Sequence, residues 1–144
     1  TVLGRITAEL GTDGLFPTAT QLAEHGETVL RGPASRVTTI LGAARALASG
    51  ELVLDVGMPA DEFTARLVAL PGIGPWTAGY LAMRVLGNPD VLLTSDLVIR
   101  QSAGALGLPS SPGALAEHGS RWAPWRSYAG LHLWRSRPTG TIRA

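Results

Sequence analysis

A glycine-rich turn between two predicted helices is the first part of the chain whose residues could do chemistry. It reads Leu70-Pro71-Gly72-Ile73-Gly74, and Pro75, a residue favoured at the first position of a helix, follows directly. Glycine lets the backbone turn sharply and leaves its amides uncovered by a side chain. Amides at the N-terminus of a helix attract anions. The turn therefore predicts a phosphate site, although a lone Gly-x-Gly is more often a tight turn between two core helices.

A single aspartate before another predicted helix is the second candidate. Asp96 precedes the helix expected at 97–106, where it or Ser95 could act as the N-cap. A carboxylate held there is also a fixed anion, which could stabilise positive charge that develops on a substrate. Asp90 belongs to the turn Asn88-Pro89-Asp90, so no second acid is expected beside Asp96.

The aromatic residues are unevenly distributed, because all four tryptophans and both tyrosines lie in the second half of the chain. Trp76 and Tyr80 are one helical turn apart and share a helix face. Such rings could simply be core residues. They could also form a pocket that stacks an extruded nucleobase, and electron-rich rings bind a cationic base better than a neutral one.

Taken together, these segments resemble the helix-hairpin-helix superfamily of base-excision DNA glycosylases, and within it the alkylation-repair branch of the 3-methyladenine DNA glycosylases. The resemblance covers most of the chain, and residues 70–134 are its specific part. It rests on the run from Leu70 to Ala78, on Gly87-Asn88-Pro89-Asp90, on Leu92-Leu93-Thr94-Ser95-Asp96, on Ile99-Arg100-Gln101, and on Trp122-Ala123-Pro124-Trp125-Arg126-Ser127-Tyr128-Ala129 with His132 and Trp134.

The resemblance implies a role for each candidate residue. It makes Asp96 the catalytic carboxylate. The base pocket would be lined by Trp76, Tyr80 and Trp134, while Trp122, Trp125 and Tyr128 would be structural. DNA phosphate would meet the backbone amides of Gly72, Gly74 and Thr77. No cofactor would be required, but a Na⁺ or K⁺ ion could sit on the backbone carbonyls of Val68, Leu70 and Gly72. Arg100 and Arg126 could contact phosphate or be structural.

The implied activity is that of a monofunctional DNA N-glycosylase, which excises alkylated purines such as 3-methyladenine and 7-methylguanine from duplex DNA. One carboxylate can suffice there, because a cationic purine leaves without a general acid. The sequence has no cysteine for an iron–sulfur cluster and no lysine for a Schiff base. The alternatives are a non-catalytic helix-hairpin-helix DNA-binding module, an inactive fragment, or a purely structural helical domain.

The elements that must position these residues have helical periodicity nearly throughout, which predicts an all-α array of short helices containing a helix-hairpin-helix motif. Thr18 should cap a short helix near 19–25, Ser35 should cap the next one, and Gly50 should end it. Residues 51–57 should be a connector. Further helices are expected at 2–10, 59–69, 75–86 and 97–106, from Pro112, and from Pro124 to about Trp134, with fraying after Pro138.

Length, composition and charge limit the class of protein to which these helices can belong. With 144 residues, 45% hydrophobic residues and a net charge of +1, the chain can bury a core and is not a histone-like basic binder. We expect residues 1–144 to be the C-terminal portion of a glycosylase domain, with its upstream part absent. No apolar run reaches the ~18 residues of a membrane span. This favours a cytoplasmic protein. We also expect a monomer, in bacteria, that is associated with the nucleoid when it acts on DNA.

Overall fold

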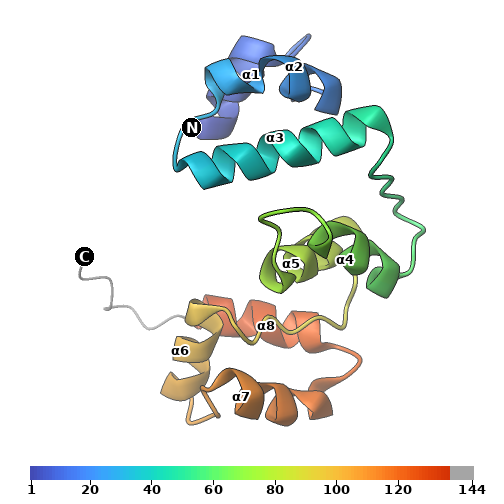
Figure 1. The fold of residues 1–144 in the computed structure, drawn as a ribbon. Helices are drawn as coiled ribbons and strands as arrows, with labels where there is room; N and C mark the ends of the chain where they lie inside the picture. The colour runs from blue at the N-terminus through green and yellow to red at the C-terminus, as the bar shows by residue number, and fades with distance from the viewer. Residues whose placement is uncertain (137–144) are drawn as a thin grey trace. The chain divides into compact units, whose positions relative to one another are not determined.

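The computed structural model describes residues 1–136, and that part of the chain is built from helices without a strand. This confirms the all-α prediction, with residues 51–57 as a connector (Figure 1). The elements are α1 (Val2–Leu10), α2 (Ala19–Val29), α3 (Ala34–Ser49), α4 (Ala60–Val68), α5 (Pro75–Val85), α6 (Leu97–Ala105), α7 (Pro112–Gly119), the short 3₁₀ helix η1 (Ser120–Trp122) and α8 (Arg126–Arg135). None of the described helices is long and apolar enough to cross a bilayer.

Several helix ends follow directly from local sequence chemistry. The hydroxyl of Thr18 accepts the N–H of Gln21, and the Gln21 side chain in turn accepts the N–H of Thr18 at 2.8 Å. This reciprocal capping box satisfies two amides that the first turn of α2 leaves unpaired. Gly50 ends α3 with a φ of 78°, a left-handed conformation that glycine adopts without steric cost.

Two helices in the first third of the chain differ from the prediction. Ser35 does not cap α3, because the helix begins one residue before it, with Pro33 at the N-cap and no side-chain cap. The Ser35 carbonyl instead accepts the Thr39 hydroxyl at 3.0 Å inside the helix. α2 continues to Val29 rather than ending near residue 25, since its last turn is buried; a Cβ at Gly26 would lie 2.8 Å from the Leu41 side chain.

The last helix begins later than expected. Pro124 does not open it, because the chain first forms η1 and then a turn in which the Trp125 N–H donates to the Trp122 carbonyl at 2.7 Å. α8 starts only at Arg126. The fraying predicted after Pro138 lies outside the described residues.

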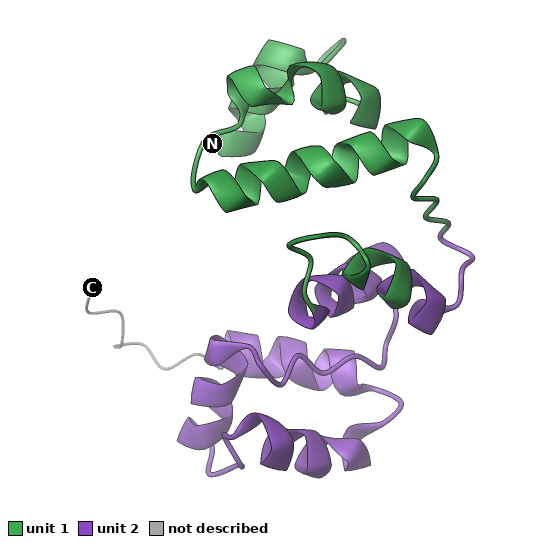
Figure 2. Cartoon of the chain, in the orientation of Figure 1, with its two compact units in different colours: residues 1–55, 65–74 green, residues 56–64, 75–144 purple. Residues whose placement is uncertain are grey.

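The chain divides into two compact units, and each is described by itself (Figure 2). Unit 1 comprises residues 1–55 and 65–74, and unit 2 comprises residues 56–64 and those from Pro75 onward. The core of unit 1 lies between α1, α2 and α3 and is formed by Ile6, Val29, Leu30 and Leu41. The core of unit 2 is formed by Leu93, Ile99, Ala103, Leu115 and Leu133. Tyr80, Trp122 and Trp134 pack against this second core.

A polar junction within unit 2 ties the loop after α5 to the start of α8. Arg126 donates to Asp90 through two nitrogens, with Nε to Oδ1 at 2.6 Å and Nη2 to Oδ2 at 2.8 Å. Ser127 donates its hydroxyl to the Asn88 carbonyl at 2.7 Å and accepts the Val91 N–H at 2.9 Å. Such a two-point Arg–carboxylate contact fixes orientation as well as distance. The junction therefore sets where α8 begins relative to the chain that leads into α6.

The two charged groups of this junction shift each other's pKa. The hydrogen bond from Arg126 lowers the pKa of Asp90, and the hydrogen bond to Asp90 raises the pKa of Arg126. A carboxyl whose pKa is lower in the folded state binds fewer protons there than when unfolded. Its contribution to stability is present above its unfolded pKa and is lost as the pH falls through its folded pKa.

Acidification should therefore weaken the junction. As the pH falls from neutral through the unfolded and then the folded pKa of Asp90, the urea midpoint of the chain should fall, because Asp90 takes up a proton on unfolding. Asp90→Asn should lower the midpoint at neutral pH and flatten its decline in acid. Asp13→Asn, in the exposed turn after α1, is the matched control and should leave the pH profile unchanged. Identical profiles for Asp90→Asn and the parent chain would contradict this assignment.

Candidate active site at the start of helix α6

Asp96 is held at the start of α6 by the backbone of its own helix. It is the N-cap residue, and its Oδ1 accepts the N–H of Ile99 at 2.9 Å. The prediction that Asp96 or Ser95 caps this helix is resolved in favour of Asp96. The cap leaves the side chain half-buried in unit 2. The carboxylate is thus fixed in place but still accessible to solvent.

Two tryptophans from distant parts of the sequence converge on the same carboxylate. Trp76 of α5 donates its Nε1–H to Oδ2 of Asp96 at 3.0 Å, and Trp134 of α8 donates its Nε1–H to Oδ1 at 3.0 Å. With the amide of Ile99, the carboxylate receives three N–H donors from three helices. Capping the helix uses only the bond to Ile99, so the two indole contacts are additional to the cap.

The aromatic rings around Asp96 also contact each other. Trp76 and Tyr80 are stacked, with ring centroids 5.5 Å apart and planes 4° apart. Tyr80 meets the edge of Trp134 at 6.0 Å. Trp76 keeps 40% of its surface exposed, so part of this ring is open to a ligand. The structure therefore brings together Asp96, Trp76, Tyr80 and Trp134.

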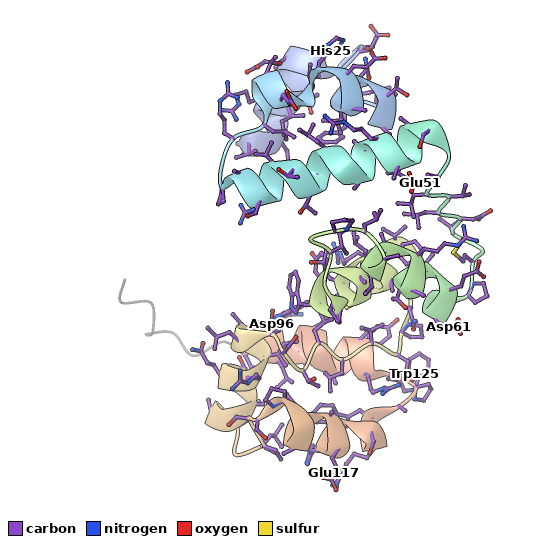
Figure 3. All side chains as sticks on the ribbon, in the orientation of Figure 1. His25, Glu51, Asp61, Asp96, Glu117 and Trp125 are labelled. Carbon is purple, nitrogen blue, oxygen red and sulfur yellow. The ribbon has the colours of Figure 1, made fainter. Side chains whose placement is uncertain are left out.

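The other aromatic residues of unit 2 lie elsewhere. Figure 3 shows Asp96 and Trp125 toward opposite ends of α8. Trp122 packs on the core and meets the ring of His118 at 5.2 Å, in agreement with a packing role. Trp125 and Tyr128 form an edge contact with each other but are 59% and 54% exposed. These two rings therefore contact each other at the surface rather than in the core, and their structural role stays a prediction.

The hairpin turn has one glycine that the fold requires and one that it does not. Gly72 has a φ of 86°, and a Cβ there would overlap the side chain of Thr39, which also belongs to unit 1. The carbonyl of Leu70 accepts the N–H of Ile73 at 3.1 Å and closes the turn. A Cβ at Gly74 would meet nothing within 4 Å. Steric packing therefore explains Gly72 but not Gly74.

The predicted phosphate and cation sites stay predictions. Gly72 and Gly74 belong to unit 1 and Thr77 to unit 2, so their joint contact with a phosphate stays a prediction. The carbonyls of Val68, Leu70 and Gly72 all belong to unit 1. Val68 is the last residue of α4, where the helix dipole favours a cation. Backbone carbonyls suit Na⁺ or K⁺. The described residues contain no cluster of acidic and histidine side chains that could hold a metal ion.

The two arginines whose role the sequence left open both have internal partners. Arg100 donates its Nε–H to the carbonyl of Ser110 at 2.8 Å, and Arg126 is paired with Asp90. Sequence reasoning placed Asp90 in the turn, and Asn88 does accept its N–H at 2.9 Å. It missed the ion pair because the two residues are 36 positions apart and no local pattern links them.

Comparison with known proteins identifies the fold around this site. No protein-family model matches the chain. It is 49% identical over 119 residues to the probable bifunctional transcriptional activator/DNA repair enzyme AlkA of Mycobacterium tuberculosis, matching 83% of this chain and 24% of that protein. It is 34% identical over 122 residues to DNA-3-methyladenine glycosylase 2 of Escherichia coli, matching 83% of this chain and 42% of that protein. The chain thus spans less than half the length of these relatives.

Solved structures agree with the sequence relatives. The 3-methyladenine DNA glycosylase Mag1 of Schizosaccharomyces pombe, in complex with abasic DNA, superposes with a TM-score of 0.83 at 25% identity, over 93% of this chain and 69% of Mag1. The chain has the fold of the helix-hairpin-helix DNA glycosylases. A DNA-3-methyladenine glycosidase of Bacillus halodurans gives a TM-score of 0.75 at 29% identity, over 96% of this chain and 66% of the other. The resemblance seen in the sequence is confirmed.

Within this glycosylase fold, the carboxylate of Asp96 accepts N–H donors from three different helices. It lies where a helix N-terminus, two indole N–H groups and a stacked aromatic pair meet. An anion placed beside aromatic rings can accept a cationic or charge-developing ligand. The arrangement is chemically suited to stabilising positive charge on a planar, partly exposed substrate group.

Proposed function

We propose that this chain carries the catalytic centre of a monofunctional DNA N-glycosylase that removes alkylated purines from duplex DNA. The observation that carries the proposal is the Asp96 carboxylate, which is fixed by Trp76, Trp134 and Ile99 beside a stacked aromatic pair. The names of the relatives, which are DNA-3-methyladenine glycosylases, support the same reaction class.

The reaction would use Asp96 as its charged group. Cleavage of the N-glycosidic bond builds positive oxocarbenium character at C1′ of the deoxyribose, and a fixed carboxylate stabilises it. Water adds its oxygen to C1′ and releases a proton, while the bond electrons leave with the base. An N3- or N7-alkylated purine carries a positive charge before the bond breaks, so it departs as a neutral base without a general acid.

The aromatic rings would select the base. An extruded purine needs a flat surface, and the open part of Trp76 provides one beside Tyr80 and Trp134. Cation–π attraction favours a positively charged methylpurine over a neutral base. We therefore expect 3-methyladenine and 7-methylguanine to be released faster than uracil or 8-oxoguanine.

The hairpin would hold the DNA backbone. Amides of Gly72, Gly74 and Thr77 would meet a phosphate, and a Na⁺ or K⁺ ion on the carbonyls of Val68, Leu70 and Gly72 would offset its charge. The protein would act as a monomer on the duplex, in the bacterial cytoplasm. The Mag1 structure, which contains abasic DNA, supports the DNA contact.

A non-catalytic DNA-binding module is the second candidate, because the chain spans only 24% and 42% of two relatives whose names denote repair enzymes. Release of methylated purines from alkylated duplex DNA distinguishes the two. The assay should be run on this chain and on the product of its complete gene. If only the complete gene product releases methylated purines, the chain is an incomplete part of the catalytic unit. If neither releases them, the DNA-binding module is favoured.

The first functional test removes the charge of Asp96. Asp96→Asn keeps the size and the capping ability of the side chain. Base release should fall by at least ~100-fold, the scale of losing one strong electrostatic contact, while DNA binding persists. Single-turnover kinetics on DNA containing 3-methyladenine measure this, with Glu117→Gln on the exposed face of α7 as the control. Release within a few-fold of the parent rate would contradict the catalytic role.

The second test places a charge in the hairpin. Gly74→Asp introduces an anion where the phosphate should approach, and nothing in the fold resists its Cβ. The dissociation constant for DNA should rise by about tenfold or more through charge repulsion. Gly74→Asn has nearly the same shape without the charge and should weaken binding much less. Fluorescence anisotropy with damaged and undamaged duplexes checks this, and equal binding by both variants would place the phosphate site elsewhere.

The third test concerns the product. A glycosylase that also cuts the strand forms an imine through an amine, normally a lysine, and this sequence contains none. Water must therefore be the nucleophile, and the product should be an intact strand with an abasic site. Borohydride should trap no adduct between the chain and damaged DNA, and strand breaks should appear only after alkali. A trapped adduct mapped to a side chain of this sequence would overturn the monofunctional mechanism.

A further inference from the structure

The two oxygens of Asp96 are not equivalent. Oδ1 accepts both the amide of Ile99 and the indole N–H of Trp134, at 2.9 and 3.0 Å. A carboxylate oxygen has two lone pairs in its plane, so the protein occupies both on Oδ1. Among the residues that the structure describes, Oδ2 accepts only the indole N–H of Trp76, at 3.0 Å. One lone pair of Oδ2 is left for a substrate.

From this asymmetry we propose that Trp76 and Trp134 are positioning residues for Asp96, beyond their part in the base pocket. Their indole N–H groups fix the rotation of the carboxylate and present the open lone pair of Oδ2 to the deoxyribose. The inference rests on the proposed glycosylase function, since it names the oxygen that faces C1′.

The positioning role follows from how a carboxylate can move. The terminal torsion of an aspartate side chain has a broad energy minimum, so one bond to the helix cap leaves it free to turn. Ile99 and Trp134 both bind Oδ1 and act on the same atom. Trp76 binds the other oxygen and therefore opposes rotation most directly. Its loss should cost more than the loss of the Trp134 N–H.

The donors can do this because their rings are themselves held. Trp76 lies flat against Tyr80, and Tyr80 meets the edge of Trp134. Both Tyr80 and Trp134 pack against the buried core of unit 2. A fixed anion stabilises a transition state better than one that must first be ordered, because the cost of orientation is met before the reaction. Loss of an indole N–H should thus lower kcat more than it raises KM.

The test removes the N–H without removing the ring. 3-Benzothienylalanine has nearly the shape of tryptophan, but a sulfur replaces the N–H group. At position 76 it should lower kcat for 3-methyladenine release by about tenfold, as expected for one hydrogen bond to a charged group, with KM within about twofold. At position 134 the fall in kcat should be smaller. At position 125, an exposed ring near the other end of α8, kcat should not change.

A double-mutant cycle separates positioning from stacking. In an Asp96→Asn background, benzothienylalanine at position 76 should cause little further loss, because the charged acceptor is already gone. Equal losses in the parent chain and in the Asp96→Asn variant would show that the ring acts by stacking alone and would overturn the proposal.

A second measurement does not depend on activity. The chain has four tryptophans, so its ¹⁵N spectrum should show four indole N–H resonances. Asp96→Asn should shift those of Trp76 and Trp134 and leave those of Trp122 and Trp125 in place. Failure of the first two to shift would overturn the positioning role. If they shift but neither the chain nor its complete gene product releases a base, the glycosylase proposal fails while the indole contacts stand.

Discussion

One carboxylate receives N–H donors from three helices. The positions of α5, α6 and α8 must therefore keep all three donors within hydrogen-bond distance of it. The donors are the amide of Ile99 and the indoles of Trp76 and Trp134. A displacement of either α5 or α8 along its axis would leave an indole N–H without its acceptor. Because a polar group that is shielded from water costs free energy when unpaired, the part-buried contact of Trp134 makes the site sensitive to helix position. A local capping interaction has thereby become a constraint on tertiary structure.

The rest of unit 2 supplies the rigidity that this constraint needs. Ile99 is itself a core residue and is only 1% exposed. The amide that donates to Asp96 therefore belongs to a residue whose side chain is buried. At the other end of α8, Arg126 and Ser127 bind the loop that leads from α5 toward α6. α8 is therefore anchored through a polar junction at its start and through Trp134 at its end. This support at both ends of α8 holds the ring of Trp134 in a fixed position beside Asp96.

The sequence predicted those features that depend on neighbours along the chain. The N-cap at Thr18, the helix end at Gly50 and the position of Asp96 before its helix follow from short-range backbone chemistry, and the structure confirms them. Ser35 was misplaced because several residues near a helix start can act as a cap, and packing decides where the helix begins. The Asp90–Arg126 pair and the indole contacts could not be predicted from spacing, since they join residues 20 to 38 positions apart. The roles of the site residues came from family resemblance and remain predictions.

The two hairpin glycines face different demands, and substitution profiles would reveal this. At position 72 a side chain would overlap Thr39, and the backbone has a positive φ that residues other than glycine rarely adopt. Replacing Thr39 by a smaller residue would remove only the first of these two restrictions. Position 72 should stay intolerant in any background in which the turn is kept. Position 74 has open space, so a selection for folding alone should accept many residues there. If a selection for DNA repair then depletes variants at position 74, the depletion measures recognition rather than folding. The pair of glycines thus offers an internal reference for separating the two pressures within one short turn.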